Sequence, residues 1–208
     1  AFTYLQLHEN QKAIALFQQL KTLNPHYQSL YLYLAEALQE EEQLEEAKAV
    51  IEEGIAENPF QVELYQFASE NAYRLHDIAG AENWLLKALE LGEKTDESRL
   101  TLSNLYITEE RFEEVITILN DLEETDHPYA EWNLAKAYNE LENFAVAKVH
   151  YEQAAQELSH EPEFLKEYAL FLREEGELEK AKHLLYHYLE HEPGDVDMQS
   201  VLADMEER

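Results

Sequence analysis

Small and apolar side chains recur along the chain at a spacing that fits one face of an α-helix. A small residue stands at six positions separated by 34, 34, 34, 32 and 34 residues: Ala13, Ala47, Ala81, Val115, Ala147 and Ala181. Four residues after each of them lies a larger apolar side chain: Phe17, Ile51, Leu85, Leu119, Tyr151 and Leu185. Because a spacing of four keeps side chains on one helix face, the pattern predicts a helix that repeats six times.

A second apolar pattern precedes each of these helices. Tyr31, Leu34 and Leu38 mark it before the second small residue, and Leu165, Tyr168 and Leu172 mark it before the last. Proline closes three of the repeats, at Pro25, Pro59 and Pro193, where its missing N–H stops a helix. The chain is therefore predicted to be all-α and built from antiparallel helix pairs, which bury their apolar faces only by stacking.

The predicted repeats cover the whole chain as a single domain. The final segment carries Met198, Val201 and Leu202 on one face, and acidic residues on the other. We interpret it as a helix that caps the last repeat, although a seventh repeat that is merely interrupted there gives the same pattern. The predicted boundaries are 1–27 (partial), 28–61, 62–95, 96–127, 128–161 and 162–195, with the capping helix at 196–208.

This pattern resembles the tetratricopeptide repeat family. The resemblance rests on the 34-residue period and on stretches such as "YLYLAEAL…EEAKAVIEEGIAENP" (Tyr31 to Pro59) and "WNLAKAY…FAVAKVHYEQA" (Trp132 to Ala154). It implies a right-handed α-solenoid of about six repeats. The 32-residue interval departs from the family pattern and predicts a tightened loop near Asp121–Pro128.

Composition restricts the classes of partner. The chain has 45 acidic and 15 basic residues, so its formal charge is −30, which opposes binding to nucleic acid and to anionic membrane surfaces. With 45% hydrophobic residues and 11% aromatic residues, the chain can nevertheless build a packed core. It has no cysteine and no apolar run long enough to cross a membrane. Together with its Glu-rich repeats, this composition is typical of a cytoplasmic bacterial protein.

The acidic residues gather at the turns between the two helices of a repeat. Glu40–Glu42 with Glu45 and Glu46 form one cluster, and Glu109, Glu110, Glu113 and Glu114 form another. They are interpreted as a solvated edge whose carboxylates favour the helix N-terminus. A docking edge for a basic partner is the alternative.

In the resembled family the first helices of the repeats line a concave surface that holds a peptide. Transferring those positions to this sequence predicts a partner-binding groove formed by Tyr73, Arg74, Asn104, Ile107, Tyr129, Trp132, Lys136, Asn139, Lys166 and Arg173. The cations gather at its C-terminal end, where we expect an aromatic or acidic segment or a terminal carboxylate to bind. The alternative is that Trp132 packs within the repeats and that the cations balance nearby carboxylates such as Glu163 and Glu167.

No other constellation in the sequence predicts chemistry. His183, His187 and His191 lie four residues apart on one predicted helix, but a metal site needs a further ligand and an ordered surrounding, so we predict no metal and no cofactor. There is no nucleophile or phosphate-binding motif, so we predict no enzyme. The sequence predicts a non-catalytic scaffold or adaptor that binds a protein or peptide, with homodimer formation through an exposed apolar start (Phe2, Tyr4, Leu5) as the alternative.

Overall fold

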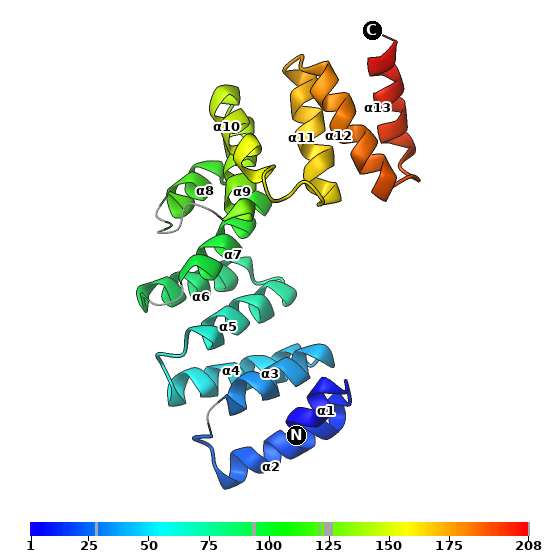
Figure 1. The fold of residues 1–208 in the computed structure, drawn as a ribbon. Helices are drawn as coiled ribbons and strands as arrows, with labels where there is room; N and C mark the ends of the chain where they lie inside the picture. Colours follow the sequence, from blue (N-terminus) through cyan, green and yellow to red (C-terminus); the bar gives the residue numbers. More distant parts are fainter. Residues whose placement is uncertain (28, 93–94, 121, 123–126, 208) are drawn as a thin grey trace. The chain divides into compact units, whose positions relative to one another are not determined.

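A computed structural model describes residues 1–27, 29–92, 95–120, 122 and 127–207. These residues form thirteen α-helices and no strand (Figure 1), which confirms the predicted all-α fold. The helices are α1 (Phe2–Gln6), α2 (Asn10–Leu23), α3 (Leu30–Glu40), α4 (Leu44–Glu57), α5 (Val62–Arg74), α6 (Ile78–Glu90), α7 (Thr95–Thr108), α8 (Phe112–Leu119), α9 (Pro128–Glu140), α10 (Phe144–Ala154), α11 (Pro162–Glu174), α12 (Leu178–His191) and α13 (Val196–Glu206). The tightened loop expected near 121–128 lies largely outside the described residues.

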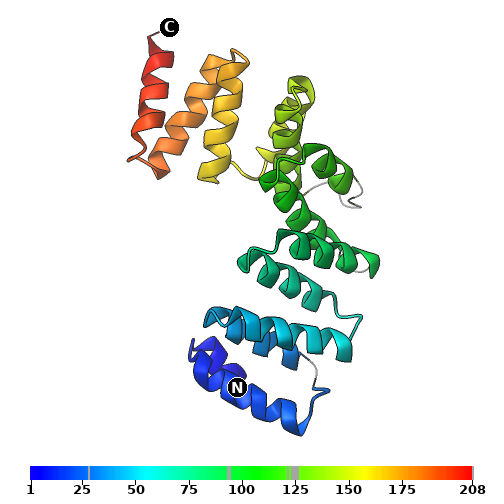
Figure 2. The same cartoon turned by 180° about the vertical axis from the view of Figure 1, so that it is seen from behind.

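The chain forms two compact units, an N-terminal unit from Ala1 to Leu105 and a C-terminal unit from Tyr106 to Arg208. The boundary falls inside α7. Within the N-terminal unit α3 packs against α4 and α5 against α6, and within the C-terminal unit α9 packs against α10 and α11 against α12. These are the antiparallel pairs that the sequence predicts. Figure 2 shows α11, α12 and α13 side by side from behind.

The six small residues that mark the repeat are all buried, and none is more than 1% exposed. Helices α3 and α4 also approach each other closely beside Gly54. A Cβ atom at Gly54 would lie 2.6 Å from the Cβ of Tyr31 on the neighbouring α3, so only glycine fits there without a shift of the helices. Small side chains thus set the distance between the helices of a pair.

The turn inside each helix pair is closed by a residue in the left-handed conformation. These residues keep the period of the repeat: His8, Glu42, His76, Glu110, Glu142 and Gly176 have φ between 55° and 80°. Around Glu142, the Asn143 amide donates to the Tyr138 carbonyl at 2.8 Å and the Glu142 amide donates to the Asn139 carbonyl at 2.9 Å. This is the Schellman arrangement that usually carries glycine, yet only the last of the six turns has one.

The final helix, α13, covers the end of the C-terminal unit. Met198, Leu202 and Met205 are buried in the same apolar cluster as Leu185 and Tyr188 of α12. The Asp195 carboxylate caps α13 by accepting a hydrogen bond from the Met198 amide at 3.0 Å. No helix in the described part of the chain is long and apolar enough to span a bilayer.

Candidate functional site

The C-terminal unit contains a hollow of about 650 Å³, which we call the α9–α11 groove. Most of its wall comes from the first helices of the repeats, α7, α9 and α11, and the second helices contribute Phe112 and Tyr151. The lining residues are Ile107, Glu110, Phe112, Lys136, Asn139, Glu140, Tyr151, Glu167, Leu170, Phe171 and Glu174. The structure therefore brings together three residues of the predicted groove, Ile107, Lys136 and Asn139.

A carboxylate that the sequence singled out only as a possible counter-charge organises the wall of this groove. One oxygen of Glu167 accepts hydrogen bonds from the Trp132 indole N–H at 3.0 Å and from the Tyr151 hydroxyl at 2.8 Å. Its other oxygen lies 3.9 Å from the ammonium of Lys136. Side chains from α9, α10 and α11 thus meet at one acidic group.

The Lys136 ammonium is held between an aromatic ring and a carboxylate. It lies 4.1 Å from the centre of the Trp132 ring, a distance at which the ring face attracts a cation. Burial lowers the pKa of Lys136, and the charge of Glu167 partly opposes that shift. Burial also raises the pKa of the Tyr151 hydroxyl, and Glu167 raises it further, so this tyrosine is a neutral donor at ordinary pH.

The charge of the groove is acidic. Its lining contains four carboxylates, Glu110, Glu140, Glu167 and Glu174, and one ammonium, that of Lys136, which gives a formal charge of −3. Since the ammonium already faces Glu167, the remaining carboxylates set the local potential. A cationic group is favoured here over an anionic one.

Two cations of the predicted groove lie outside this lining and have carboxylate neighbours of their own. The Lys166 ammonium donates to Asp195 at 3.0 Å, at the turn before α13. A guanidinium nitrogen of Arg173 lies 4.0 Å from Glu174. These pairs correspond to the alternative considered from the sequence, in which the cations balance local carboxylates.

The predicted aromatic residues lie at the start of α9. Trp132 packs edge-on against Phe164, with ring centres 5.5 Å apart and an interplanar angle of 87°. Tyr129 is exposed and its ring lies 6.3 Å from that of Trp132. Neither residue is among those that line the groove, so the indole of Trp132 acts in the structure as a packing and hydrogen-bonding group.

The other predicted residues belong to the N-terminal unit. Tyr73 is exposed on α5. Arg74 donates to the Gln39 carbonyl at 2.8 Å and pairs with Glu42 at 2.9 Å, so it ties α5 to the turn after α3. Asn104 is exposed on α7.

Two of the three histidines of α12 take part in ring contacts. The rings of His187 and His191 are 5.4 Å apart, and the His160 ring lies 6.1 Å from that of His187. Among the described residues no three His, Asp or Glu side chains are placed to hold a metal ion. Sequence analysis missed Glu167 as an organising residue, because its role depends on side chains from three helices.

Serial helix pairs with a hollow along their first helices define a class of helical-repeat proteins that typically bind other proteins. Residues 4–69 match the family model described as "Tetratricopeptide repeat", and residues 128–195 match the model described as "YpiA-like, C-terminal tetratricopeptide repeats". The chain belongs to the tetratricopeptide repeat family, as its sequence pattern indicates.

One curated relative is the TPR repeat-containing protein YpiA of Bacillus subtilis (strain 168), which is 32% identical over 208 residues. The alignment covers 99% of this chain and 49% of the relative, so the chain spans about half the length of that protein.

Solved structures share the fold at low identity. PilF of Pseudomonas aeruginosa matches with a TM-score of 0.79 at 15% identity, covering 98% of this chain and 93% of its own. PilW, described as a type IV pilus biogenesis factor, matches with a TM-score of 0.77 at 15% identity, over 97% and 94% of the two chains. YrrB, described as "a TPR protein with an unusual peptide-binding site", matches with a TM-score of 0.68 at 14% identity, over 89% and 96%.

Proposed function

We propose that this protein is a non-catalytic scaffold that binds an extended segment of a partner protein in the α9–α11 groove. The observation that carries the proposal is the hollow of about 650 Å³ on the first helices of the C-terminal unit, which falls within the usual size range of binding pockets. The peptide-binding site named for YrrB agrees with such a role for the fold. The bacterial relative and the composition support a cytoplasmic setting.

The chemistry of the lining indicates which segment fits. Ile107, Leu170 and Phe171 offer apolar surface, and the Asn139 amide can form hydrogen bonds with a peptide backbone. The carboxylates of Glu140 and Glu174 at the rim favour lysine or arginine. The proposed ligand therefore alternates apolar and basic side chains, in contrast to the acidic segment that the cations Lys166 and Arg173 suggested from the sequence.

A peptide library displayed on phage tests this preference. Enriched 12-residue peptides are expected to combine Leu, Ile or Phe with Lys or Arg, and their affinities are then measured by fluorescence anisotropy. In the Glu140→Gln/Glu174→Gln variant the affinity is expected to fall about three- to tenfold, since each exposed ion pair contributes about 0.2–1 kcal/mol. The matched control Glu190→Gln/Glu207→Gln removes the same charge from exposed positions outside the groove. Equal affinities in both variants, or a library enriched in acidic peptides, refute the proposal.

Self-association is the second candidate, and exposed leucines of the first helix pair favour it. Leu16 and Leu23 lie seven residues apart on α2, and Leu23 is 84% exposed. Phe2 and Tyr4 are exposed as expected, but Leu5 is buried, so the sequence prediction was wrong for Leu5. Its side chain turns inward because it belongs to the cluster formed with Ala13 and Phe17.

Sedimentation velocity at several concentrations tests this candidate. A dimer that Leu16→Asp/Leu23→Asp abolishes supports self-association. A monomer at every concentration argues against it. Because Leu5 is part of the core, aspartate there would report on folding, and α2 is the proper place for the substitution.

A further inference from the structure

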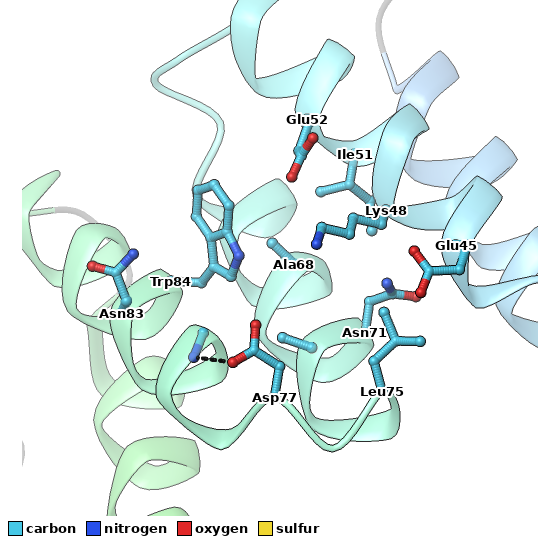
Figure 3. A pocket seen from close by; sticks show the side chains of 12 residues that line it. Glu45, Lys48, Ile51, Glu52, Ala68, Asn71, Leu75, Asp77, Asn83 and Trp84 are labelled. Atoms are coloured by element: carbon cyan, nitrogen blue, oxygen red, sulfur yellow. Dashed lines mark hydrogen bonds between the residues drawn. The ribbon is translucent and has the colours of Figure 1, made fainter.

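The N-terminal unit contains a second hollow, of about 390 Å³, between α4 and α6 and above α5 (Figure 3). It is lined by the second helices of two successive repeats, whereas the α9–α11 groove is lined mainly by first helices. It belongs to the other compact unit, and the inference drawn from it does not depend on the proposed function.

The hollow exists because the third repeat has small side chains where the other repeats have large ones. At the two positions equivalent to 68 and 72, the first helices of the second, fourth, fifth and sixth repeats carry bulky side chains: Leu34 and Leu38, Leu102 and Tyr106, Leu134 and Tyr138, and Tyr168 and Leu172. The third repeat has Ala68 and Ala72 at these positions, and both line the hollow. A partner's side chain can therefore occupy space that the chain fills by itself elsewhere.

The walls of the hollow are an indole ring on one side and charged side chains on the other. Trp84 of α6 stands on one side, and Lys48 and Glu52 of α4 stand opposite, with the Lys48 amine directed toward the indole (Figure 3). Tyr65 packs against the indole with ring centres 6.0 Å apart, and this contact supports the orientation of Trp84.

The charge at the rim of the hollow favours a basic group of a ligand. Glu45, Glu52 and Asp77 outnumber Lys48, so the lining has a formal charge of −2. The Asp77 carboxylate accepts a hydrogen bond from the Gly80 amide at 2.9 Å. In the part of the chain that the structure describes, Glu45 and Glu52 form no ion pair, so their charges can act on a ligand.

We propose that this hollow, the α4–α6 pocket, binds a partner-protein segment that inserts one bulky apolar side chain and places a lysine or arginine beside it. The apolar side chain lies over Ala68 and Ala72 and against Trp84. The basic side chain lies at the rim near Glu45 and Glu52. Burial of the apolar side chain supplies affinity, and the ion pairs select the flanking charge.

The two tryptophans make the test specific. Trp84 lies in the pocket and Trp132, the second tryptophan of the chain, lies in the other unit. The two indole N–H signals in a ¹H–¹⁵N NMR spectrum therefore report the two hollows separately, because the Trp132 N–H donates to Glu167 in the wall of the α9–α11 groove. The signals are assigned with a Trp132→Phe variant. The probes are acetylated glycine–serine host peptides with a central Leu-Arg, Leu-Gln, Leu-Glu or Gly-Arg pair.

The Leu-Arg peptide is expected to shift the Trp84 signal saturably, and the other three peptides are expected to bind at the pocket more weakly. A shift of the Trp132 signal is attributed to the α9–α11 groove and does not bear on the pocket. Ala68→Leu/Ala72→Leu, which restores the residues of the second repeat, is expected to weaken binding at least tenfold. Glu45→Gln/Glu52→Gln is expected to weaken it about three- to tenfold, whereas Glu40→Gln/Glu46→Gln, with the same change of charge outside the pocket, leaves it unchanged.

Several results overturn the proposal. They are the absence of a saturable Trp84 shift at millimolar peptide, tighter binding of the Leu-Glu peptide, and equal effects of the two glutamine double variants. If the leucine double variant does not fold, the two glutamine variants still decide the question, because they change only exposed side chains.

Discussion

Replacing Glu142 with glycine is expected to stabilise the C-terminal unit by relieving a strained turn. Glu142 has φ of 58° at the turn between α9 and α10, a conformation that costs an L-residue about 1–2 kcal/mol. Glycine adopts it without that cost but loses about 0.5–1 kcal/mol more backbone entropy on folding. The difference predicts that Glu142→Gly raises the free energy of unfolding by about 1 kcal/mol.

The next repeat offers the reciprocal experiment within the same unit. Gly176 closes the equivalent turn with φ of 80°, and a Cβ added there would meet no atom within 4 Å. Gly176→Ala therefore tests the backbone cost alone and is expected to lower the free energy of unfolding by about 1 kcal/mol. Glu142→Ala removes the charge but keeps a Cβ, so it separates electrostatics from strain and is expected to gain little.

Urea unfolding followed by circular dichroism at 222 nm measures these differences. The midpoint should move without a change in the slope m, because the exposed surface is the same in all variants. Thermal midpoints are expected to shift by about 4–8 °C per kcal/mol for a cooperative unit of this size. If Glu142→Gly and Glu142→Ala behave alike, or if Gly176→Ala is neutral, left-handed strain is not a significant cost in these turns.

Three further predictions concern packing and titration. Gly54→Ala should destabilise the N-terminal unit by about 1–3 kcal/mol, because the new methyl group overlaps Tyr31; an unchanged urea midpoint contradicts this. Glu167→Ala should destabilise the C-terminal unit by about 1–3 kcal/mol, because the charge-assisted hydrogen bonds of two partly buried donors are lost. Glu167→Gln should lose less stability, which calorimetry can measure. Hydrogen bonds from a tyrosine, a backbone amide and a lysine lower the pKa of Asp195 to about 2. Burial, and to a lesser extent the charge of nearby carboxylates, raises the pKa of Tyr168 to about 12. Stability from Asp195 should be present above pH 3.8 and lost as the pH falls toward 2, and stability from Tyr168 should be present below pH 10 and lost toward pH 12. Over these ranges the urea midpoint of the unmodified protein is expected to fall more steeply than that of Asp195→Asn or Tyr168→Phe, respectively, and equal pH dependence contradicts the assignment.

The candidate site could be predicted only in part. Ile107, Lys136 and Asn139 line the α9–α11 groove because the repeat places them on the first helices, and that phase is readable from the sequence. The carboxylate partners of Lys166 and Arg173 could not be predicted from the phase of the repeat. Lys166 has the phase of a groove residue, but its flexible side chain reaches Asp195 in the turn before α13, a partner 29 residues away that periodicity does not reveal.

The amino-acid sequence by itself determined the helices, their pairing and the phase of the repeat. These follow from local periodicity and from the small residues at the helix contacts, which repeat every 32 or 34 positions. Tertiary structure decided the network around Glu167, the hollow over Ala68 and Ala72, and the left-handed glutamates and histidines in the turns. The network and the hollow depend on side chains from three packed helices each, and the left-handed residues depend on the hydrogen bonds that close the turn inside each pair. The apolar periodicity of the sequence reports neither of them.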